Sequence, residues 1–186
     1  AAAKSVMDAG NYSLATGNPA DAYFELFAQI DYSNNPEVLL YKHYDFATYN
    51  IQNSMWNHPN AQGMTHWMTK YYLCTDGLPI GVSPLFVGDS TLSLVQVNRD
   101  PRLDQSLIVP GELDYVSLTG DSVYYQVPFM IRCPTGYALQ KWRTKWLNPL
   151  ESDRRTRDLG RILFRYAEAL LIYAEAKGEL GTLTQG

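Results

Sequence analysis

The stretch RYAEALLIYAEAKGELG, residues 165–181, decides the fold that the sequence predicts. Apolar side chains recur along it at i, i+3, i+4 and i+7, the spacing that places them on one face of a helix. This first stripe contains Leu163, Tyr166, Ala167, Leu170, Tyr173 and Ala174, and a second stripe contains Ile162, Ala169, Ile172, Ala176 and Leu180. A narrow polar edge remains, made of Arg165, Glu168, Glu175 and Glu179. The pattern therefore predicts a helix that includes Ile162 and Leu163 and packs against neighbours on two sides.

Small side chains on this helix allow another helix to approach closely. Stacked helix pairs in solenoid folds need such a surface, and four alanines provide it here: Ala167, Ala169, Ala174 and Ala176. Gly178 or Gly181 is placed to end the helix, because glycine adopts the left-handed conformation after a helix at little cost. Residues 1–8 indicate the last turns of another helix, with Gly10 just beyond its end.

Six stretches together carry a resemblance to a known family. In chain order they are NNPEVLLYKHY (residues 34–44), YYLCTDGLPI (71–80), Gly88-Asp89, NRDPRL (98–103), Thr135-Gly136-Tyr137 with Lys141, and residues 165–181. In this order they resemble the SusD/RagB family, the surface glycan-capturing lipoproteins that partner an outer-membrane SusC-like transporter. The resemblance is specific because several motifs, spread over most of the chain, occur in one order.

The resemblance implies a mainly α fold, with a tetratricopeptide-like helical scaffold and irregular, loop-rich and small β portions. It implies that residues 1–186 are the central portion of a single SusD-like domain, with the N-terminal and C-terminal parts missing. The partners would be an oligosaccharide or polysaccharide and a SusC-like TonB-dependent transporter. The protein would be a surface-exposed lipoprotein of the outer membrane, held by an N-terminal lipid anchor absent from this chain.

Charge and composition exclude several other classes of function. A net charge of −4 and a pI near 5.3 offer no basic surface for nucleic acid. No apolar run approaches the ~20 residues that a membrane helix needs. A length of 186 residues is enough to bury one sizeable core, so the chain is one domain or part of one.

Cysteine and histidine spacings predict neither a metal site nor a bound cofactor. Cys74 and Cys133 are too few for a disulfide scaffold and fit no zinc or redox motif, so we expect two buried thiols, with a disulfide as the alternative. His43, His58 and His66 have no HExxH motif and no cysteine partner at ligand spacing. We therefore predict no metal ligands.

No catalytic residue can be assigned from a motif. The chain contains no GxSxG elbow, Walker loop or GxGxxG. Hydrolysis of a glycoside needs two carboxylates about 5 to 10 Å apart, and the sequence leaves pairs such as Asp76 with Glu112 open. Asp76, however, precedes Gly77 in a pattern typical of a turn, which favours a structural role for this carboxylate.

The candidate ligand site lies in residues 49–69, YNIQNSMWNHPNAQGMTHWMT, which have the composition of an exposed loop. Sugars present apolar patches ringed by hydroxyls, so a sugar site needs a flat aromatic face with hydrogen-bonding groups at its edge. The predicted face is Trp56 and Trp67, and the predicted edge is Asn53, Asn57 and His66. The alternative is that both tryptophans pack the loop against the scaffold.

Three further segments carry expectations about local structure. Asn18 and Pro19 predict the start of a short helix over residues 20–27, whereas residues 37–44 are either extended or helical. Asp100 before Pro101 favours a turn, where Arg99 and Arg102 would bind carboxylates or carbonyls. Residues 123–127 suggest a strand in a small sheet.

A second pair of tryptophans follows near residue 141. Trp142 and Trp146 share one side on either a helix or a strand. The pattern favours inward packing of both tryptophans, because three cations would lie on the opposite, solvent-exposed side: Lys141, Arg143 and Lys145.

The sequence thus favours a non-enzymatic glycan-binding protein. The second hypothesis is a helical-repeat adaptor that binds peptide or protein ligands. The third is a carbohydrate-active hydrolase, for which no motif places the carboxylates.

Overall fold

The computed structural model describes residues 2–48, 63–117, 119–126, 133–142, 144–145 and 158–183. The helices in this part of the chain are α1 (Ala2–Asp8), α2 (Ala22–Leu26), α3 (His66–Tyr71), α4 (Leu92–Val95), α5 (Pro101–Asp104) and α7 (Tyr166–Glu179), with a 3-10 turn η1 at Phe46–Thr48. The strands are β1 (Val38–Lys42), β2 (Leu107–Ile108), β3 (Leu113–Val116), β4 (Ser122–Tyr124), β5 (Ala138–Leu139) and β6 (Arg161–Arg165). None of these helices is both long and apolar enough to cross a bilayer.

Short antiparallel strand pairs connect parts of the chain that are distant in sequence. β1 pairs with β6, β2 with β5, and β3 with β4. In the β1–β6 pair, Val38 lies opposite Arg165 and Lys42 opposite Arg161, with register shifts between them. The open question over residues 37–44 is therefore resolved as a strand, and β4 confirms the start of the predicted strand at Val123.

The long C-terminal helix, α7, begins later than the sequence predicted. Ile162 and Leu163 lie in β6, and α7 starts at Tyr166, so placing these two residues in the helix was wrong. Pairing with β1 satisfies the backbone of residues 161–165 as a strand. Alternation along the strand then leaves Ile162 against the core and Leu163 exposed. The helix ends as expected, with Gly181 in the left-handed conformation (φ 62°).

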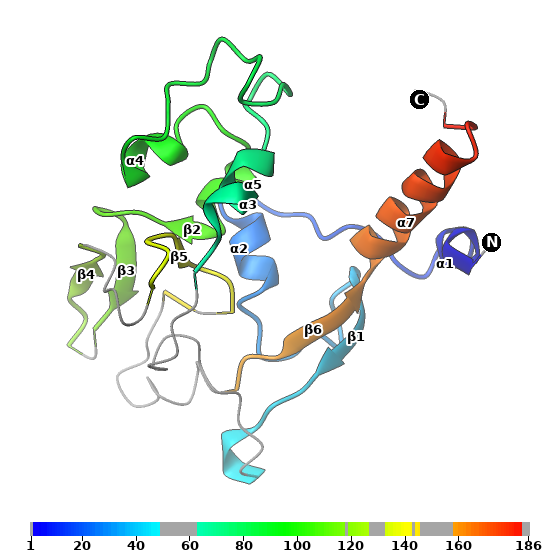
Figure 1. The fold of residues 1–186 in the computed structure, drawn as a ribbon. Coiled ribbons are helices and arrows are strands. Elements are labelled where there is room, and N and C mark those ends of the chain that lie inside the picture. The colour runs from blue at the N-terminus through cyan, green and yellow to red at the C-terminus, as the bar shows by residue number, and fades with distance from the viewer. Residues whose placement is uncertain are drawn as a thin grey trace.

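Figure 1 shows α1 and α7 side by side at one end of the molecule, where the β1–β6 pair joins them to the rest. The predicted N-terminal helix and the left-handed Gly10 beyond it (φ 64°) are confirmed. The predicted irregular loops and small β portions are also confirmed. The tetratricopeptide-like scaffold is not, because in the described part of the chain every helix other than α7 has seven residues or fewer.

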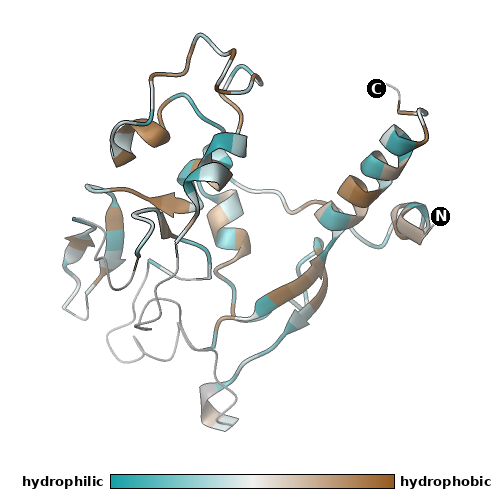
Figure 2. Cartoon of the chain, in the orientation of Figure 1, coloured by the Kyte–Doolittle hydropathy of each residue, from teal (hydrophilic) through white to brown (hydrophobic). Residues whose placement is uncertain are grey.

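Two apolar clusters form the core of the main body. The first joins α4, α5 and the β2–β5 pair through Met64, Val95, Leu103, Leu107 and Val109. The second joins α2 to β1 through Leu26, Phe27, Tyr32 and Val38, with Ile162 packed against it. Brown segments in Figure 2 mark the apolar strands that take part, β2 and β6 among them. Cys74 and Cys133 are buried free thiols, which confirms the first expectation and rules out the disulfide.

A buried glutamine caps helix α2. Gln105, at the end of α5, accepts hydrogen bonds at Oε1 from the backbone nitrogens of Tyr23 (2.8 Å) and Phe24 (3.1 Å). The predicted cap, Asn18, instead accepts from the nitrogen of Ala20 (3.1 Å) in the turn before the helix. Sequence reasoning could not find the true cap, because it comes from more than 80 positions away.

Glu37 connects three segments of the chain. Its Oε2 accepts from the nitrogen of Ala15 (2.8 Å), and its Oε1 pairs with Nη1 of Arg165 at 2.9 Å. The carbonyl of Glu37 also accepts from the nitrogen of Tyr166 (2.7 Å), the first residue of α7. The sequence predicted that Arg165 lies on the polar edge of the helix. This was wrong, because Arg165 is bound to the buried carboxylate of Glu37.

Trp142 packs inward, although not on a helix or strand. Its backbone is left-handed (φ 63°), and its ring meets Phe27 edge to face at 5.0 Å. The expectation that the neighbouring cations stay wet is wrong for Lys141, whose Nζ donates to the Tyr23 hydroxyl at 2.7 Å and lies 4.4 Å from the Phe27 ring centre. Trp146 and Arg143 lie outside the described residues.

We expect Glu37→Gln to lower the free energy of unfolding of the full-length protein by about 3 kcal/mol, because it leaves Arg165 without its buried partner. The amide still accepts from Ala15, so the change isolates the ion pair. Urea denaturation measures the effect. The control is Asp8→Asn, which breaks the exposed Lys4–Asp8 pair and should leave the midpoint unchanged. Equal midpoints for the two variants would contradict the role assigned to Glu37.

Candidate functional site

Helix α3 displays two aromatic rings on its outer face. Thr65 caps its first turn by accepting from the nitrogen of Met68 (3.1 Å), and Thr69 faces the interior. Trp67 and Tyr71, which are one helical turn apart, are 72% and 73% exposed. Nζ of Lys70 lies 5.6 Å from the centre of the Trp67 ring, a cation–π distance. The outer face of α3, made of Trp67, Lys70 and Tyr71, is called the α3 face below.

Three distant segments meet beside the α3 face. The ring of His66 lies parallel to that of Tyr137, with an interplanar angle of 2° and centres 5.8 Å apart. Nε2 of His66 is 2.9 Å from Oδ2 of Asp89, and this hydrogen bond holds the pKa of the Asp89 carboxyl below its ordinary value. The contacts fix the start of α3 against the turns at residues 88–89 and 135–137.

The approach of these segments depends on a residue without a side chain. The nitrogen of Met64 donates to the carbonyl of Tyr137 at 2.8 Å. A Cβ at Gly63 would lie 2.0 Å from Oγ1 of Thr135 and 3.1 Å from the carbonyl oxygen of Tyr137. A side chain at position 63 would therefore displace the Thr135 hydroxyl and crowd the carbonyl of Tyr137.

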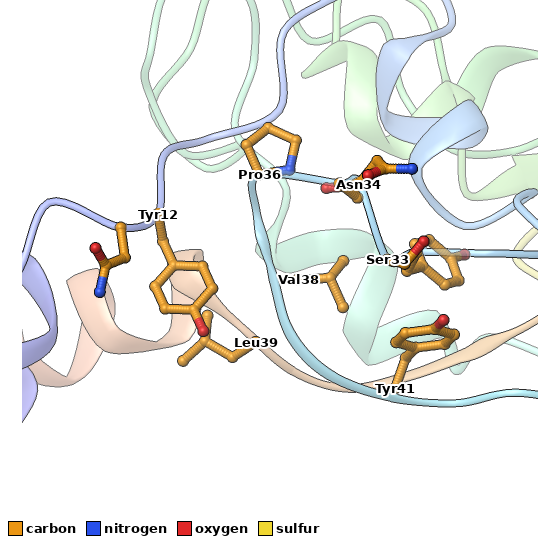
Figure 3. A pocket seen from close by; sticks show the side chains of 10 residues that line it. Tyr12, Ser33, Asn34, Pro36, Val38, Leu39 and Tyr41 are labelled. Atoms are coloured by element: carbon orange, nitrogen blue, oxygen red, sulfur yellow. The ribbon is translucent and has the colours of Figure 1, made fainter.

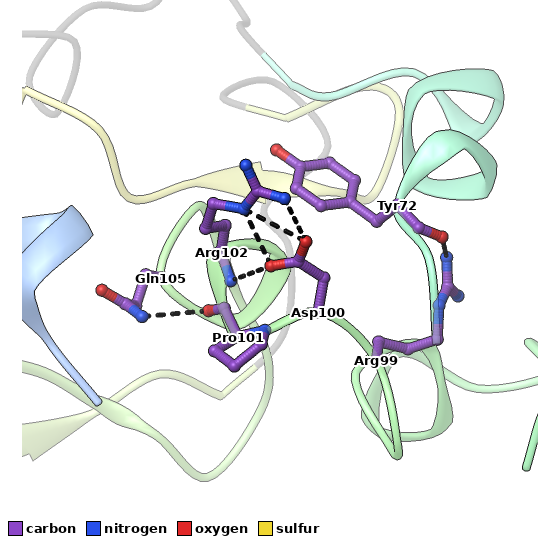
Figure 4. A network of polar contacts seen from close by, with 6 residues as sticks. All are labelled: Tyr72, Arg99, Asp100, Pro101, Arg102 and Gln105. Atoms are coloured by element: carbon purple, nitrogen blue, oxygen red, sulfur yellow. Dashed lines mark hydrogen bonds and ion pairs between the residues drawn. The ribbon is translucent and has the colours of Figure 1, made fainter. Parts of the chain in front are cut away.

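The other end of α3 is held by a buried arginine (Figure 4). Nη2 of Arg99 donates to the carbonyls of Thr69 (2.6 Å) and Tyr72 (2.7 Å), and Nη1 donates to that of Val95 (3.3 Å). The last carbonyls of a helix have no partner within the helix, so the guanidinium satisfies groups that burial would otherwise leave unpaired. The expectation that Arg99 binds carbonyls is confirmed.

Arg102 binds a carboxylate, as the sequence predicted. Its Nε donates to Oδ1 of Asp100 at 3.0 Å, and Asp100 also caps α5 by accepting from the nitrogen of Arg102 (Figure 4). The guanidinium holds the pKa of the Asp100 carboxyl below its usual value.

Asp76 is confirmed as a turn former, since its carboxylate accepts from the nitrogen of Leu78 (3.0 Å) and the hydroxyl of Ser83 (2.8 Å).

The structure places two of the five predicted ligand residues. Trp67 is exposed and its ring is accessible, whereas the ring of adjacent His66 is bound to Tyr137 and Asp89. The other predicted site residues, Asn53, Trp56 and Asn57, lie outside the described residues. The composition of residues 49–69 predicted a loop, so helix α3 and the presence of Trp67 and Tyr71 on one face of it were missed. The i, i+4 spacing of the two rings was the available signal.

A cluster of carboxylates lines a cavity of about 310 Å³. Its members are Asp21, Glu25, Asp104 and Glu112, and Lys145 lies among them. Burial raises the pKa of Glu112, and nearby Asp104 raises it further. Burial also raises the pKa of Glu25. Asp76 and Glu112 were the example of a possible catalytic carboxylate pair. Asp76 binds Leu78 and Ser83, whereas Glu112 borders this cavity, whose described lining does not include Asp76. In the described part of the chain, no group of three or more His, Cys, Asp or Glu side chains is arranged to hold a metal ion.

Comparison with known proteins adds family-level information. Residues 13–185 match the sequence model of the SusD family. Among solved structures, the fold is similar to that of a SusD-like protein from Bacteroides fragilis NCTC 9343, with a TM-score of 0.67 and 18% sequence identity. The match covers 97% of this chain and 39% of that chain, and at this identity it shows the fold alone. No curated protein matches the chain.

We expect Glu112→Gln to raise the melting temperature of the full-length protein at pH 7. Because the pKa of Glu112 is raised in the folded state, ionisation at neutral pH opposes folding, and protonation removes this cost as the pH falls. The glutamine oxygen can still accept from the nitrogen of Val109. The gain should vanish towards about pH 4, near the ordinary pKa of glutamate. Glu175→Gln on exposed α7 is the matched control, and a gain independent of pH would contradict the explanation.

Proposed function

Because this chain belongs to the SusD family, as its motifs predicted, we propose that it binds glycans through the α3 face. It captures oligosaccharides or polysaccharide at the cell surface and passes them to a SusC-like TonB-dependent transporter. The observation that carries the proposal is the pair of exposed rings, Trp67 and Tyr71, on one side of one helix.

The chemistry of the α3 face suits a sugar. Two residues whose backbone positions are about 6 Å apart along a helix axis can offer flat apolar ring surfaces to the axial C–H groups of neighbouring sugar units. Lys70 beside Trp67 can donate hydrogen bonds to hydroxyls at the edge of such a ligand. Arg99 and the His66–Tyr137 contact hold the helix at both ends, so the rings are presented before the ligand arrives.

The proposed activity is binding without bond cleavage. Hydrolysis would need two carboxyl groups about 5 to 10 Å apart on either side of a glycosidic bond. At the α3 face the carboxylate of Asp89 is bound to His66, and its pKa is lowered rather than raised. A general acid needs the opposite shift. We therefore assign the nearby polar groups to hydrogen bonding with the ligand. The proposed function requires no cofactor.

We also propose that residues 1–186 form the central portion of a single SusD-like domain in an outer-membrane lipoprotein whose anchor lies outside this chain. The exposed apolar side of α7 supports this proposal, because Leu171 is 68% exposed and Ile172 is also accessible. One flank of α7 is covered by α1. The solved SusD-like chain is longer, and further helices of the same protein would cover the remaining flank.

The glycan proposal predicts that Trp67→Ala weakens binding to the full-length protein by roughly tenfold, about 1.4 kcal/mol. Titration calorimetry with a panel of oligosaccharides measures the change. Tyr124→Ala is the matched control, because Tyr124 is an exposed aromatic residue on β4, away from the α3 face. Unchanged affinity in Trp67→Ala would remove the α3 face from the site. A protein that co-purifies with a transporter but binds no glycan would instead favour a peptide-binding adaptor.

The domain proposal predicts that Leu171→Ala lowers the free energy of unfolding of the full-length protein by about 2 to 5 kcal/mol, the cost of truncating a buried leucine. Denaturant titration of the intact protein measures it. If Leu171 stays exposed in the full-length protein, the substitution will leave the stability unchanged, and the covering helices would be refuted.

A further inference from the structure

A second cavity lies between the segment before α2 and the turn that enters β1 (Figure 3). Its volume is about 390 Å³, within the range of about 300 to 1,000 Å³ typical of small-molecule sites. In Figure 3, Tyr12 lies on one side of Val38, and Ser33 and Tyr41 lie on the other. Three tyrosines and two aliphatic residues therefore line the cavity together with polar side chains: Tyr12, Tyr32, Tyr41, Val38 and Leu39.

Among the described residues that line this cavity, none has a side chain with a formal charge. The lining consists of asparagines, tyrosines, a serine, a proline and aliphatic residues. Asp31 is the nearest carboxylate along the turn, and its oxygens are already used: Oδ1 accepts from Tyr41 (2.6 Å) and from the nitrogen of Ser33 (2.8 Å), and Oδ2 accepts from the Ser33 hydroxyl (3.0 Å). An anionic ligand would find no cation among the described lining residues and would meet the nearby Asp31 carboxylate, so the chemistry favours a neutral sugar over an acidic one.

The hydrogen-bonding groups around the cavity are divided between donors and acceptors. The hydroxyl of Ser33 donates to Asp31, which leaves the Ser33 oxygen able to accept. The hydroxyl of Tyr41 also donates to Asp31, but its oxygen is already hydrogen-bonded to the backbone of Tyr32. Asn35 is occupied, because its amide donates to Gln29 and accepts from the nitrogen of Glu37. Within the described part of the chain, the amides of Asn11 and Asn34 make no hydrogen bond and can donate.

The frame of the cavity is fixed before any ligand binds. The nitrogen of Ser13 donates to the carbonyl of Pro36 (3.0 Å), and that of Ala15 donates to Glu37 (2.8 Å). The Tyr41 ring is held by Asp31 and by an edge contact with Tyr32 at 5.4 Å. A site whose walls are already ordered loses less entropy on binding.

We infer that this cavity is a second carbohydrate site, which takes a single neutral sugar unit. Tyrosine rings offer apolar faces, asparagine amides offer donors, and the Ser33 hydroxyl oxygen offers an acceptor, which together match a ring bearing several hydroxyl groups. The site is separate from the α3 face and shares no residue with it. It also gives a function to Asn34 and Pro36, which the motif of residues 34–44 contains.

The test is saturation-transfer NMR on the full-length protein with methyl glycosides of glucose, galactose and mannose, followed by affinity titration. Asn34→Ala, an exposed loop change, should weaken binding of the preferred glycoside roughly fivefold to tenfold, and so should Tyr12→Ala. Methyl glucuronoside should bind more weakly than its neutral counterpart because Asp31 lies nearby.

Trp67→Ala separates this inference from the function proposed for the α3 face. It should leave binding in the cavity unchanged while weakening oligosaccharide binding. If oligosaccharides fail to bind but the monosaccharide effect of Asn34→Ala persists, only the cavity inference survives. If no neutral glycoside binds, or if neither Asn34→Ala nor Tyr12→Ala changes its affinity, the second site is refuted. Circular dichroism confirms that the two variants are folded.

Discussion

The buried ion pair between Glu37 and Arg165 is the constraint on which the arrangement of the chain depends. It joins residues more than 120 positions apart and lies where β1 meets the end of β6. The same glutamate binds the segment around Ala15 through its second oxygen and α7 through its carbonyl. A buried carboxylate is costly unless it is paired, and Glu37 is bound both by the segment around Ala15 and by the junction of β6 with α7. One residue therefore fixes the N-terminal segment, the strand pair and the long helix relative to one another.

The motifs that identified the family act by building the support of the α3 face. Arg99, from NRDPRL, binds the last carbonyls of α3, and Asp89, after Gly88, binds His66 at its start. Tyr137, from Thr135-Gly136-Tyr137, stacks on His66 as well. None of these three groups needs to touch a ligand for the helix to hold its position. Recognisable sequence thus marks the scaffold, while the exposed rings of Trp67 and Tyr71 lie just outside or at the edge of the motifs.

Local patterns predicted much of the fold, and long-range contacts account for the errors. The end of α7, the turn at Asp76-Gly77 and the carbonyl-binding role of Arg99 follow from spacing and residue type alone. The strand at residues 161–165 did not, because an apolar run before a helix fits both structures and only pairing with β1 decides between them. Of the two exposed rings on the α3 face, one was accessible to sequence reasoning: Trp67 was chosen for its chemistry, but Tyr71 required knowing that a helix spans both.

The contrast between Trp67 and Trp142 shows why composition alone cannot locate an aromatic binding surface. Both indoles follow polar or charged residues, yet Trp142 meets Phe27 edge to face and has Arg161 near its ring, so burial stabilises it. Within the part of the chain that the structure describes, Trp67 makes no ring-to-ring contact, and the Lys70 ammonium lies 5.6 Å from the centre of its exposed ring. Folding recovers little free energy from a ring left in water, because the hydrophobic contribution scales with buried apolar area. The hydrophobic free energy that Trp67 and Tyr71 do not contribute to folding remains available for a ligand that covers them.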